Sequence, residues 1–281
     1  MRYGITMVAT DRSLPVAELA RAVEARGLDG VWFPDHTHIP VERASPYPLG
    51  GELPERYRRT LDPIVALALA VAVTERIRVG TGIMLVGQRD PIVTAKALAT
   101  LDQQSCGRLA VGVGYGWNVE EMADHGVDPA TRRSRVRDHV LAMRALWERE
   151  VAGYEGDHVR ISPSWSWPKP AQRPLPVLLG GPPGGATFRH VVELGQGWIA
   201  AGGGPLAEGV PRLREAAAAA GRDPADLEVV SFTTGELSHD KVDRFAALGA
   251  TEVAFDVLPG PAAEVLPTLD RLAAFVEARR G

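Results

Sequence analysis

A carboxylate and an imidazole stand side by side at Asp35 and His36, directly after an apolar run at residues 30–34. That run has the composition of a β-strand, so the pair is expected where a strand ends. Such a pair can orient a ligand or pass a proton, because imidazole titrates near neutral pH. The alternative is that Asp35 only caps a turn. His38 adds a second imidazole, but no further cluster at ligand spacing accompanies it, so no metal site is expected.

Two glycine-rich breaks follow later strands. A strand-like run in the first third of the chain is interrupted by Gly80 and Gly82, which indicates a bulge, a close approach of backbone to a ligand, or a tight turn. After a second run, at residues 109–113, Gly114 leaves backbone without side chains, which suits a flat ring. Asn118, shortly after, can donate and accept hydrogen bonds. The spacing is not that of a G-x-G-x-x-G nucleotide-binding motif.

A third glycine-rich loop contains Gly180, Gly181 and Gly185 and enters a helical pattern at Ala186 and Thr187. Free backbone N–H groups and the positive end of the helix dipole make such a helix start an anion site. The loop lacks the lysine of a P-loop, which argues against a nucleoside triphosphate and favours the phosphate of a bound cofactor. An ordinary Gly/Pro turn is the alternative.

Eight strand–helix pairs are predicted to carry these loops. No linker or charge run divides the chain, so we expect a single domain over residues 1–281. Eight βα units of this size predict a closed parallel (β/α)8 barrel, whose site lies at the carboxyl ends of the strands. A doubly wound open sheet is the competing fold. The expected strands are residues 2–7, 30–34, 76–85, 109–113, 176–179, 197–200, 228–233 and 252–255.

The composition excludes several classes of partner. The chain has 281 residues, is 45% hydrophobic and carries a net charge of −4, which indicates neither a nucleic-acid nor a membrane partner. No apolar run reaches the length of a membrane span, and the start is strand-like rather than a signal peptide. The single cysteine, Cys106, is consistent with a reducing cytoplasm. The acidic pair Glu120 and Glu121 and the basic run at 132–137 are expected on solvated helix faces, and the first residues of the basic run could instead reach a neighbouring subunit.

Together these segments resemble the luciferase-like monooxygenase superfamily, and most closely its branch that uses the deazaflavin coenzyme F420. The resemblance spans nearly the whole chain, and its motifs are specific through their order and spacing. The motifs are Trp32–His36, Val79–Ile83, Asp90–Pro91 with the helix to Asp102, Gly107–Gly114, Trp147, Leu178–Gly181 and Gly195–Trp198.

The resemblance implies a barrel with insertion segments, often dimeric, that binds the deazaflavin over a non-prolyl cis peptide at Gly82–Ile83. It places Asp35 and His36 near the ring, with His36 as the first candidate for proton transfer and His38 and Tyr115 as weaker ones. It also implies cofactor contacts from the residues discussed above, which are Gly114, Asn118, Gly180, Gly181, Gly185, Ala186 and Thr187.

The expected function is hydride transfer between F420 and a small organic substrate. The alternatives are an FMN-dependent monooxygenase that uses oxygen and a non-catalytic protein that binds a flavin or deazaflavin. A Trp after the Asp–His pair and a Glu after the strand-four glycine, typical of the sugar-phosphate dehydrogenases of the branch, are missing, which argues against that substrate. We expect residues 35–60 and 150–173 to form the lid and pocket walls. Trp165 and Trp167 are expected either to line the pocket or to belong to a satellite core under the Pro-rich loop.

Overall fold

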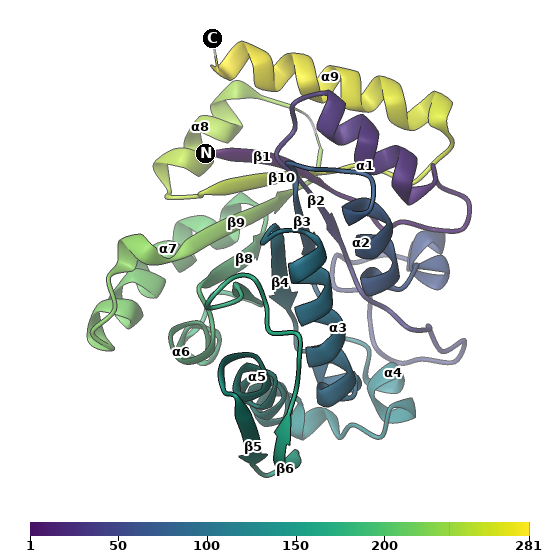
Figure 1. Cartoon of the computed structure of the whole chain (residues 1–281). Helices are drawn as coiled ribbons and strands as arrows, with labels where there is room; N and C mark the ends of the chain where they lie inside the picture. Colours follow the sequence, from purple (N-terminus) through teal and green to yellow (C-terminus); the bar gives the residue numbers. More distant parts are fainter. Residues whose placement is uncertain (236, 281) are drawn as a thin grey trace.

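The computed structural model describes residues 1–235 and 237–280 and shows a closed barrel of eight parallel strands (Figure 1). This confirms the (β/α)8 architecture and excludes the open sheet. The strands lie around the barrel in the order β1, β10, β9, β8, β7, β4, β3, β2. Their bounds are β1 Arg2–Thr6, β2 Gly30–Phe33, β3 Arg78–Thr81, β4 Leu109–Val113, β7 Val177–Gly180, β8 Gly197–Ala201, β9 Glu228–Thr233 and β10 Glu252–Asp256.

Helices surround the barrel, and α9 and α1 lie together at the end of the molecule opposite the β5–β6 hairpin (Figure 1). The α-helices are α1 Val16–Ala25, α2 Pro63–Val71, α3 Pro91–Gln104, α4 Val119–Asp124, α5 Arg132–Glu148, α6 Gly185–Leu194, α7 Gly203–Ala219, α8 His239–Ala247 and α9 Ala262–Arg280. The short 3-10 helices are η1 Glu55–Arg59, η2 Val86–Gln88, η3 Pro129–Thr131 and η4 Pro224–Asp226.

The helix starts follow from local sequence. Asp62 caps α2, with its carboxylate accepting from the N–H groups of Ile64 and Val65 at 2.9 and 3.1 Å. Asp90 caps α3 in the same way. In both helices proline occupies the first helical position, where its missing N–H costs nothing.

The barrel interior is filled by side chains from the strands rather than by a channel. Trp32 is fully buried there, and a Cβ on Gly80 would lie 2.3 Å from its ring. Only glycine at position 80 therefore leaves room for the ring of Trp32. The close approach expected at this glycine is to a core side chain and not to a ligand. The interior cluster consists of Trp32, Ala110, Leu178, Ile199, Val230 and Ala254.

Strand β3 is shorter than the predicted run of residues 76–85. It ends at Thr81, the peptide bond between Gly82 and Ile83 is cis, and the chain meets the barrel again only at the isolated bridge from Met84 to Val113. The bulge expected from the glycines and the cis peptide expected from the resemblance are both present at this strand end.

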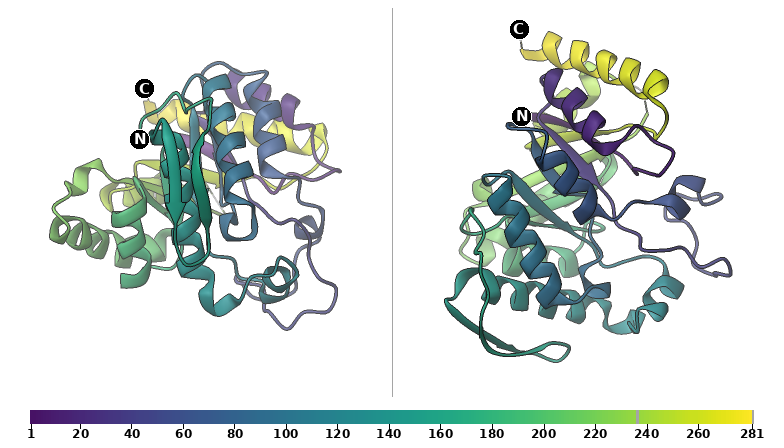
Figure 2. Two further views of the ribbon diagram at one scale, coloured as in Figure 1. Left: turned by 60° about the horizontal axis from the view of Figure 1, so that its bottom comes forward. Right: turned by 45° about the vertical axis from the view of Figure 1, so that its right-hand side comes forward.

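The insertion at 150–173 forms an antiparallel hairpin of β5 (Val151–Glu155) and β6 (Arg160–Trp165), which packs beside α5 (Figure 2). Trp165 and Trp167 are 75% and 53% exposed and lie on this hairpin and the segment after it. None of the pocket residues comes from 150–173, so the prediction that this segment and its two tryptophans line the pocket is wrong. Both tryptophans are also too exposed to belong to a satellite core. Within the described residues, no helix combines the length and apolar character needed to cross a membrane.

Candidate active site

A cavity of about 520 Å³ lies where the carboxyl ends of the barrel strands and the following loops meet. Its volume is in the range of ligand pockets, and its position is where (β/α)8 enzymes carry their sites. The lining residues used below are Asp35, His36, Tyr47, Leu49, Tyr57, Gly82, Ile83, Tyr115, Trp117, Arg132, Arg133, Gly180, Gly181, Ile199 and Phe232.

His36 is 7% exposed and has a partner at each ring nitrogen. Its Nδ1 lies 2.7 Å from Oε2 of Glu121, and its Nε2 lies 3.2 Å from the indole nitrogen of Trp117. An indole N–H can only donate, so Nε2 accepts from it and Nδ1 carries the proton given to Glu121. The neutral imidazole is therefore oriented with its unprotonated nitrogen toward Trp117, a residue of the cavity wall.

Glu121 is fully buried, which corrects the expectation that it lies on a solvated helix face. Its second oxygen accepts from the backbone N–H of Thr37 at 3.1 Å. Glu120 is also engaged, since Oε1 accepts from the N–H of Ala44 at 2.7 Å. Hydrogen bonds from Ser45 and Ala44 lower the pKa of Glu120 to about 2. Helix α4 uses both acidic residues to hold the segments that follow β2.

Asp35 lines the cavity, but its carboxylate is committed to the protein. It accepts from Nε and Nη2 of Arg89 at 2.8 and 2.7 Å and from the N–H of Leu85 at 3.0 Å. Burial lowers the pKa of Arg89, yet hydrogen bonds to Asp35 and Asp62 outweigh this and raise it. Asp35 thus ties the end of β2 to the loop after β3, and its predicted contact with a cofactor stays a prediction.

The glycines around the bulge make room for Ile83. A Cβ on Gly114 would lie 2.2 Å from Cδ1 of Ile83, and a Cβ on Gly180 would lie 2.7 Å from the same atom. Gly114 also lies outside the cavity lining, whereas Gly82, Ile83 and Gly180 belong to it. The backbone at Gly114 was expected to lie bare against a flat ring. Instead, the side chain of Ile83 covers it.

Asn118 is the N-cap of α4, with Oδ1 accepting from the N–H of Glu121 at 3.3 Å. The residue is 1% exposed and is not among the cavity-lining residues. Its Nδ2 has no hydrogen-bond partner among the described residues. The structure therefore gives Asn118 a capping role, and a cofactor contact stays a prediction.

One end of the cavity is cationic. Gly180 and Gly181 line it together with Arg132 and Arg133. This corrects the expectation that the basic run at 132–137 lies wholly on a solvated face, because α5 begins at the rim of the cavity. The guanidinium of Arg133 lies 4.2 Å from the ring centroid of Tyr115, and its buried Nη1 has no partner within the described chain.

Helix α6 begins beside this cationic end. Gly185, Ala186 and Thr187 form its first turn, where N–H groups have no partner within the helix. A Cβ on Gly181 would lie 3.2 Å from the hydroxyl of Thr187, so the loop after β7 packs directly on the helix start. The predicted anion site thus has the expected backbone, and the arginines of α5 add positive charge that the sequence did not reveal.

The loop after β2 builds an aromatic wall around His36, as expected for part of the segment 35–60. The rings of Tyr57 and Trp117 meet the imidazole edge-on, at centroid distances of 5.7 and 5.5 Å. Tyr47 completes the wall, and its hydroxyl lies 3.1 Å from that of Tyr57. Burial and this hydrogen bond raise the pKa of Tyr57, so it stays a neutral phenol. Across the cavity, burial likewise raises the pKa of Tyr115 to about 12.

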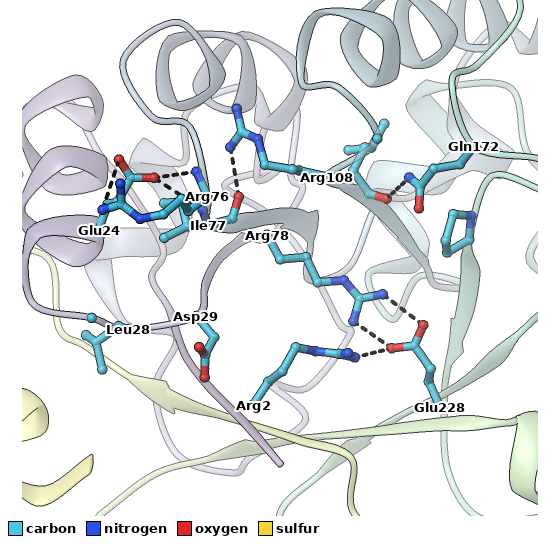
Figure 3. A pocket seen from close by; sticks show the side chains of 14 residues that line it. Arg2, Glu24, Leu28, Asp29, Arg76, Ile77, Arg78, Arg108, Gln172 and Glu228 are labelled. Carbon is cyan, nitrogen blue, oxygen red and sulfur yellow. Dashed lines mark hydrogen bonds and ion pairs between the residues drawn. The ribbon is translucent and has the colours of Figure 1, made fainter. Parts of the chain in front are cut away.

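A second pocket, of about 490 Å³, opens at the amino ends of the strands and is lined by paired charges (Figure 3). Arg78 reaches Glu228 at 2.6 Å and the fully buried Glu252 at 2.9 Å, and Arg2 bonds both carboxylates. Glu252 also accepts from the indole of Trp32 at 2.6 Å. Because these carboxylates and guanidinium groups satisfy one another, this pocket has a structural role, as is usual at that face of a barrel. Among the described residues, no group of three or more His, Cys, Asp or Glu is placed to hold a metal.

The family follows from comparison with known sequences. The luciferase-like monooxygenase family matches residues 7–241, and the chain therefore belongs to that family. It is an oxidoreductase of the luciferase-like type. An uncharacterized protein of Mycobacterium tuberculosis H37Rv is 43% identical over 98% of both chains.

More distant similarities include two proteins that are named for coenzyme F420. An F420-dependent glucose-6-phosphate dehydrogenase of Kineococcus radiotolerans is 30% identical over 221 residues, which cover 76% of this chain and 61% of the relative. An F420-dependent secondary alcohol dehydrogenase, solved with an F420–acetone adduct, superposes over both whole chains with a TM-score of 0.80 at 19% identity. A monooxygenase from Streptomyces bottropensis superposes over both whole chains with a TM-score of 0.81 at 22% identity. At these identities the two structures show the shared fold.

Proposed function

We propose that the protein is an F420-dependent oxidoreductase that transfers a hydride between the deazaflavin and a small organic substrate. A curated relative and a structural neighbour are both named for their dependence on F420. The observation that carries the proposal is one cavity lined both by Arg132 and Arg133, next to the loop that leads into α6, and by an oriented histidine after β2. When bound, F420 supplies the hydride chemistry, while the protein supplies orientation and proton transfer.

The chemistry of the lining fits a flat ring with a phosphate-bearing tail. Ile83, Ile199 and Phe232 give the middle of the cavity apolar walls. At the cationic end, Nη1 of Arg133 is a buried charged donor without a partner, which is costly unless an anion completes it. We propose that this guanidinium and the first turn of α6 hold the phosphate. FMN carries a phosphate as well, so the same residues support the flavin alternative, which the assay below separates.

We propose that His36 moves the proton that accompanies the hydride. Its unprotonated Nε2 faces the cavity wall and can accept a proton from a substrate hydroxyl, or return one to a carbonyl in the reverse direction. The loop that carries Tyr47 and Tyr57 covers this side with aromatic rings and keeps water away from the reacting groups.

We infer that the substrate is small and uncharged. The cavity wall around His36 consists of Tyr47, Leu49, Tyr57 and Trp117. The carboxylate on this side belongs to Asp35 and is already paired with Arg89. The guanidinium groups of Arg43 and Arg56 lie over Trp117 and Tyr57 but are not part of the cavity lining. A charged substrate group next to these rings would therefore lose its hydration without gaining a partner from the lining there, which makes a sugar phosphate a poor fit.

We propose that the protein forms a homodimer through α2 and α3. Four apolar side chains stand out from these helices, with Val65 and Val93 more than half exposed and Leu69 and Ile92 each 47% exposed. A groove of about 530 Å³ is lined by other residues of the same two helices. Exposed apolar side chains on neighbouring helices favour an interaction site, and a symmetric pair would cover them on both copies at once.

Separate fluorescence titrations with F420 and with FMN test the cofactor assignment, since Trp117 lines the cavity and should be quenched on binding. We expect tight binding of F420. Tight binding of FMN alone would contradict the proposal and favour the oxygen-dependent alternative, and binding of neither would leave only the fold.

The His36→Ala variant tests catalysis, with deazaflavin absorbance followed over a panel of small alcohols and ketones. General acid–base groups contribute about 10²–10⁴ in rate, so we expect turnover to fall at least about 100-fold. The dissociation constant of F420 should change little. Undiminished turnover would remove the role of His36, and binding without turnover in the wild type as well would favour a non-catalytic binding protein.

A further inference from the structure

We propose that Glu121 is the positioning residue for proton transfer: it holds His36 in the tautomer whose Nε2 is a proton acceptor, directed at Trp117 in the cavity wall. The inference rests on the proposed function of His36. Glu121 does not line the cavity itself, so it would act on the reaction only through the imidazole.

The carboxylate is held rigidly. Its side chain is fully buried, and its two oxygens are divided between the imidazole of His36 and the backbone N–H of Thr37. Its own N–H is bonded to the cap residue of α4, Asn118. A buried carboxylate persists only where partners satisfy it, so the loop after β2 and helix α4 must keep this arrangement together.

Glu121 also stands out among the groups that pack around His36. Tyr57, from η1, meets the imidazole with its ring edge and directs its hydroxyl to Tyr47. Asp35, the preceding residue, is paired with Arg89. Trp117 donates to Nε2 but carries no charge. Among these neighbours in the described chain, Glu121 is the ionisable residue whose side chain is hydrogen-bonded to the imidazole of His36.

The arrangement assigns a direction to the proton. In alcohol oxidation, the substrate O–H bond would break and Nε2 would take its proton. The hydride from the carbinol C–H bond would need an acceptor, which oxidised deazaflavin would supply when bound, and a carbonyl would remain. The substrate hydroxyl would take the place of the Trp117 indole as the donor to Nε2. The imidazolium then formed keeps its bond to Glu121, whose negative charge stabilises it. In carbonyl reduction the same proton and hydride move back.

The tautomer of His36 can be measured directly by two-dimensional NMR of protein labelled with ¹⁵N at histidine. The chain has 7 histidines, and the signals lost in His36→Ala identify the right one. At a pH where His36 is neutral, we expect the proton at Nδ1 and the lone pair at Nε2. In Glu121→Gln this preference should weaken, because an amide can either donate to or accept from Nδ1. It should be lost when Trp117→Phe is added, which removes the indole donor to Nε2. A proton at Nε2 in the wild type, or a proton still fixed at Nδ1 in the double variant, would overturn the proposal.

Two further variants keep the test decisive. Asp124→Asn removes a carboxylate from the same helix that contacts His38, at 3.0 Å, and should leave the His36 signals unchanged. Trp117→Phe removes the indole donor and should also leave the proton at Nδ1, since Glu121 still accepts it. If the tautomer switches in Trp117→Phe, then Trp117 and not Glu121 sets it, and this result holds even if Glu121→Gln fails to fold. None of these spectra needs a cofactor, so they stand apart from the binding assay.

Discussion

Arg133 provides the sharpest test of where the phosphate binds. Its guanidinium is stacked over Tyr115, and its buried Nη1 has no partner within the described chain. Arg133→Met keeps an unbranched apolar stem over the ring and removes the charged donor. A hydrogen bond to a charged group contributes about 1.5–3 kcal/mol. Because 1.4 kcal/mol corresponds to a factor of ten, the dissociation constant of F420 should rise about 10- to 100-fold.

The assay is a fluorescence titration of each variant with F420 and with the same deazaflavin chromophore lacking the phosphate. The loss should be confined to the phosphorylated ligand. Arg137→Met is the matched control, because Arg137 lies one turn further along α5 and pairs with Glu193 outside the cavity. An equal loss with both ligands would show that Arg133 supports the ring or the fold, and no loss would place the phosphate elsewhere.

Two further predictions concern assembly and pH. Leu69→Arg should place a charge in the α2–α3 surface and convert a dimer to a monomer, as measured by light scattering. Leu258→Arg is the control: this leucine is also exposed but follows β10, so the variant should stay dimeric. A monomeric wild type would contradict the proposed interface. Burial lowers the pKa of His139 to about 4, below its usual 6.5, so the unfolded chain binds the proton first and stability is lost as pH falls from about 6.5 towards 4. The loss in the free energy of unfolding is on the order of 3 kcal/mol. Urea unfolding at pH 7 and pH 4 should therefore show a smaller decrease in this free energy for His139→Gln than for the wild type. Equal decreases in the two proteins would exclude His139 as the source of the pH dependence.

The barrel could be predicted because its signals are local. Strand runs, Asp–Pro helix starts and glycine stops repeat along the chain, and the predicted strands at 109–113 and 228–233 match β4 and β9. Only the run at 76–85 was much too long, since its apolar residues continue past the point where Gly82 takes the chain out of the sheet.

The site could be predicted only where its residues sit in recognisable loops. His36 and the loop at Gly180 were found in this way. Glu121 and Arg133 were missed because they lie on helices rich in charge, and a helix pattern does not show which charges are buried. Glu121 meets its imidazole across 85 residues of chain, a distance in sequence that no local pattern spans. The glycines correctly predicted where other groups approach the backbone closely. Their positions do not show whether the approaching group is a ligand or a protein side chain such as Ile83.

The pairing of β1 with β10 has a consequence for how the protein is made. Trp32 and Arg78 share the buried acceptor Glu252, which follows Trp32 by 220 residues. At synthesis rates of about 5–20 residues per second, roughly 10 to 45 s pass between the appearance of the tryptophan and that of its acceptor. During that interval β1 also has an unpaired edge, because Arg2–Thr6 pairs with Glu252–Asp256 on one side. The half-made barrel therefore exposes both a strand edge and unmatched charges, and its yield in cells should depend on what shields them until β10 emerges.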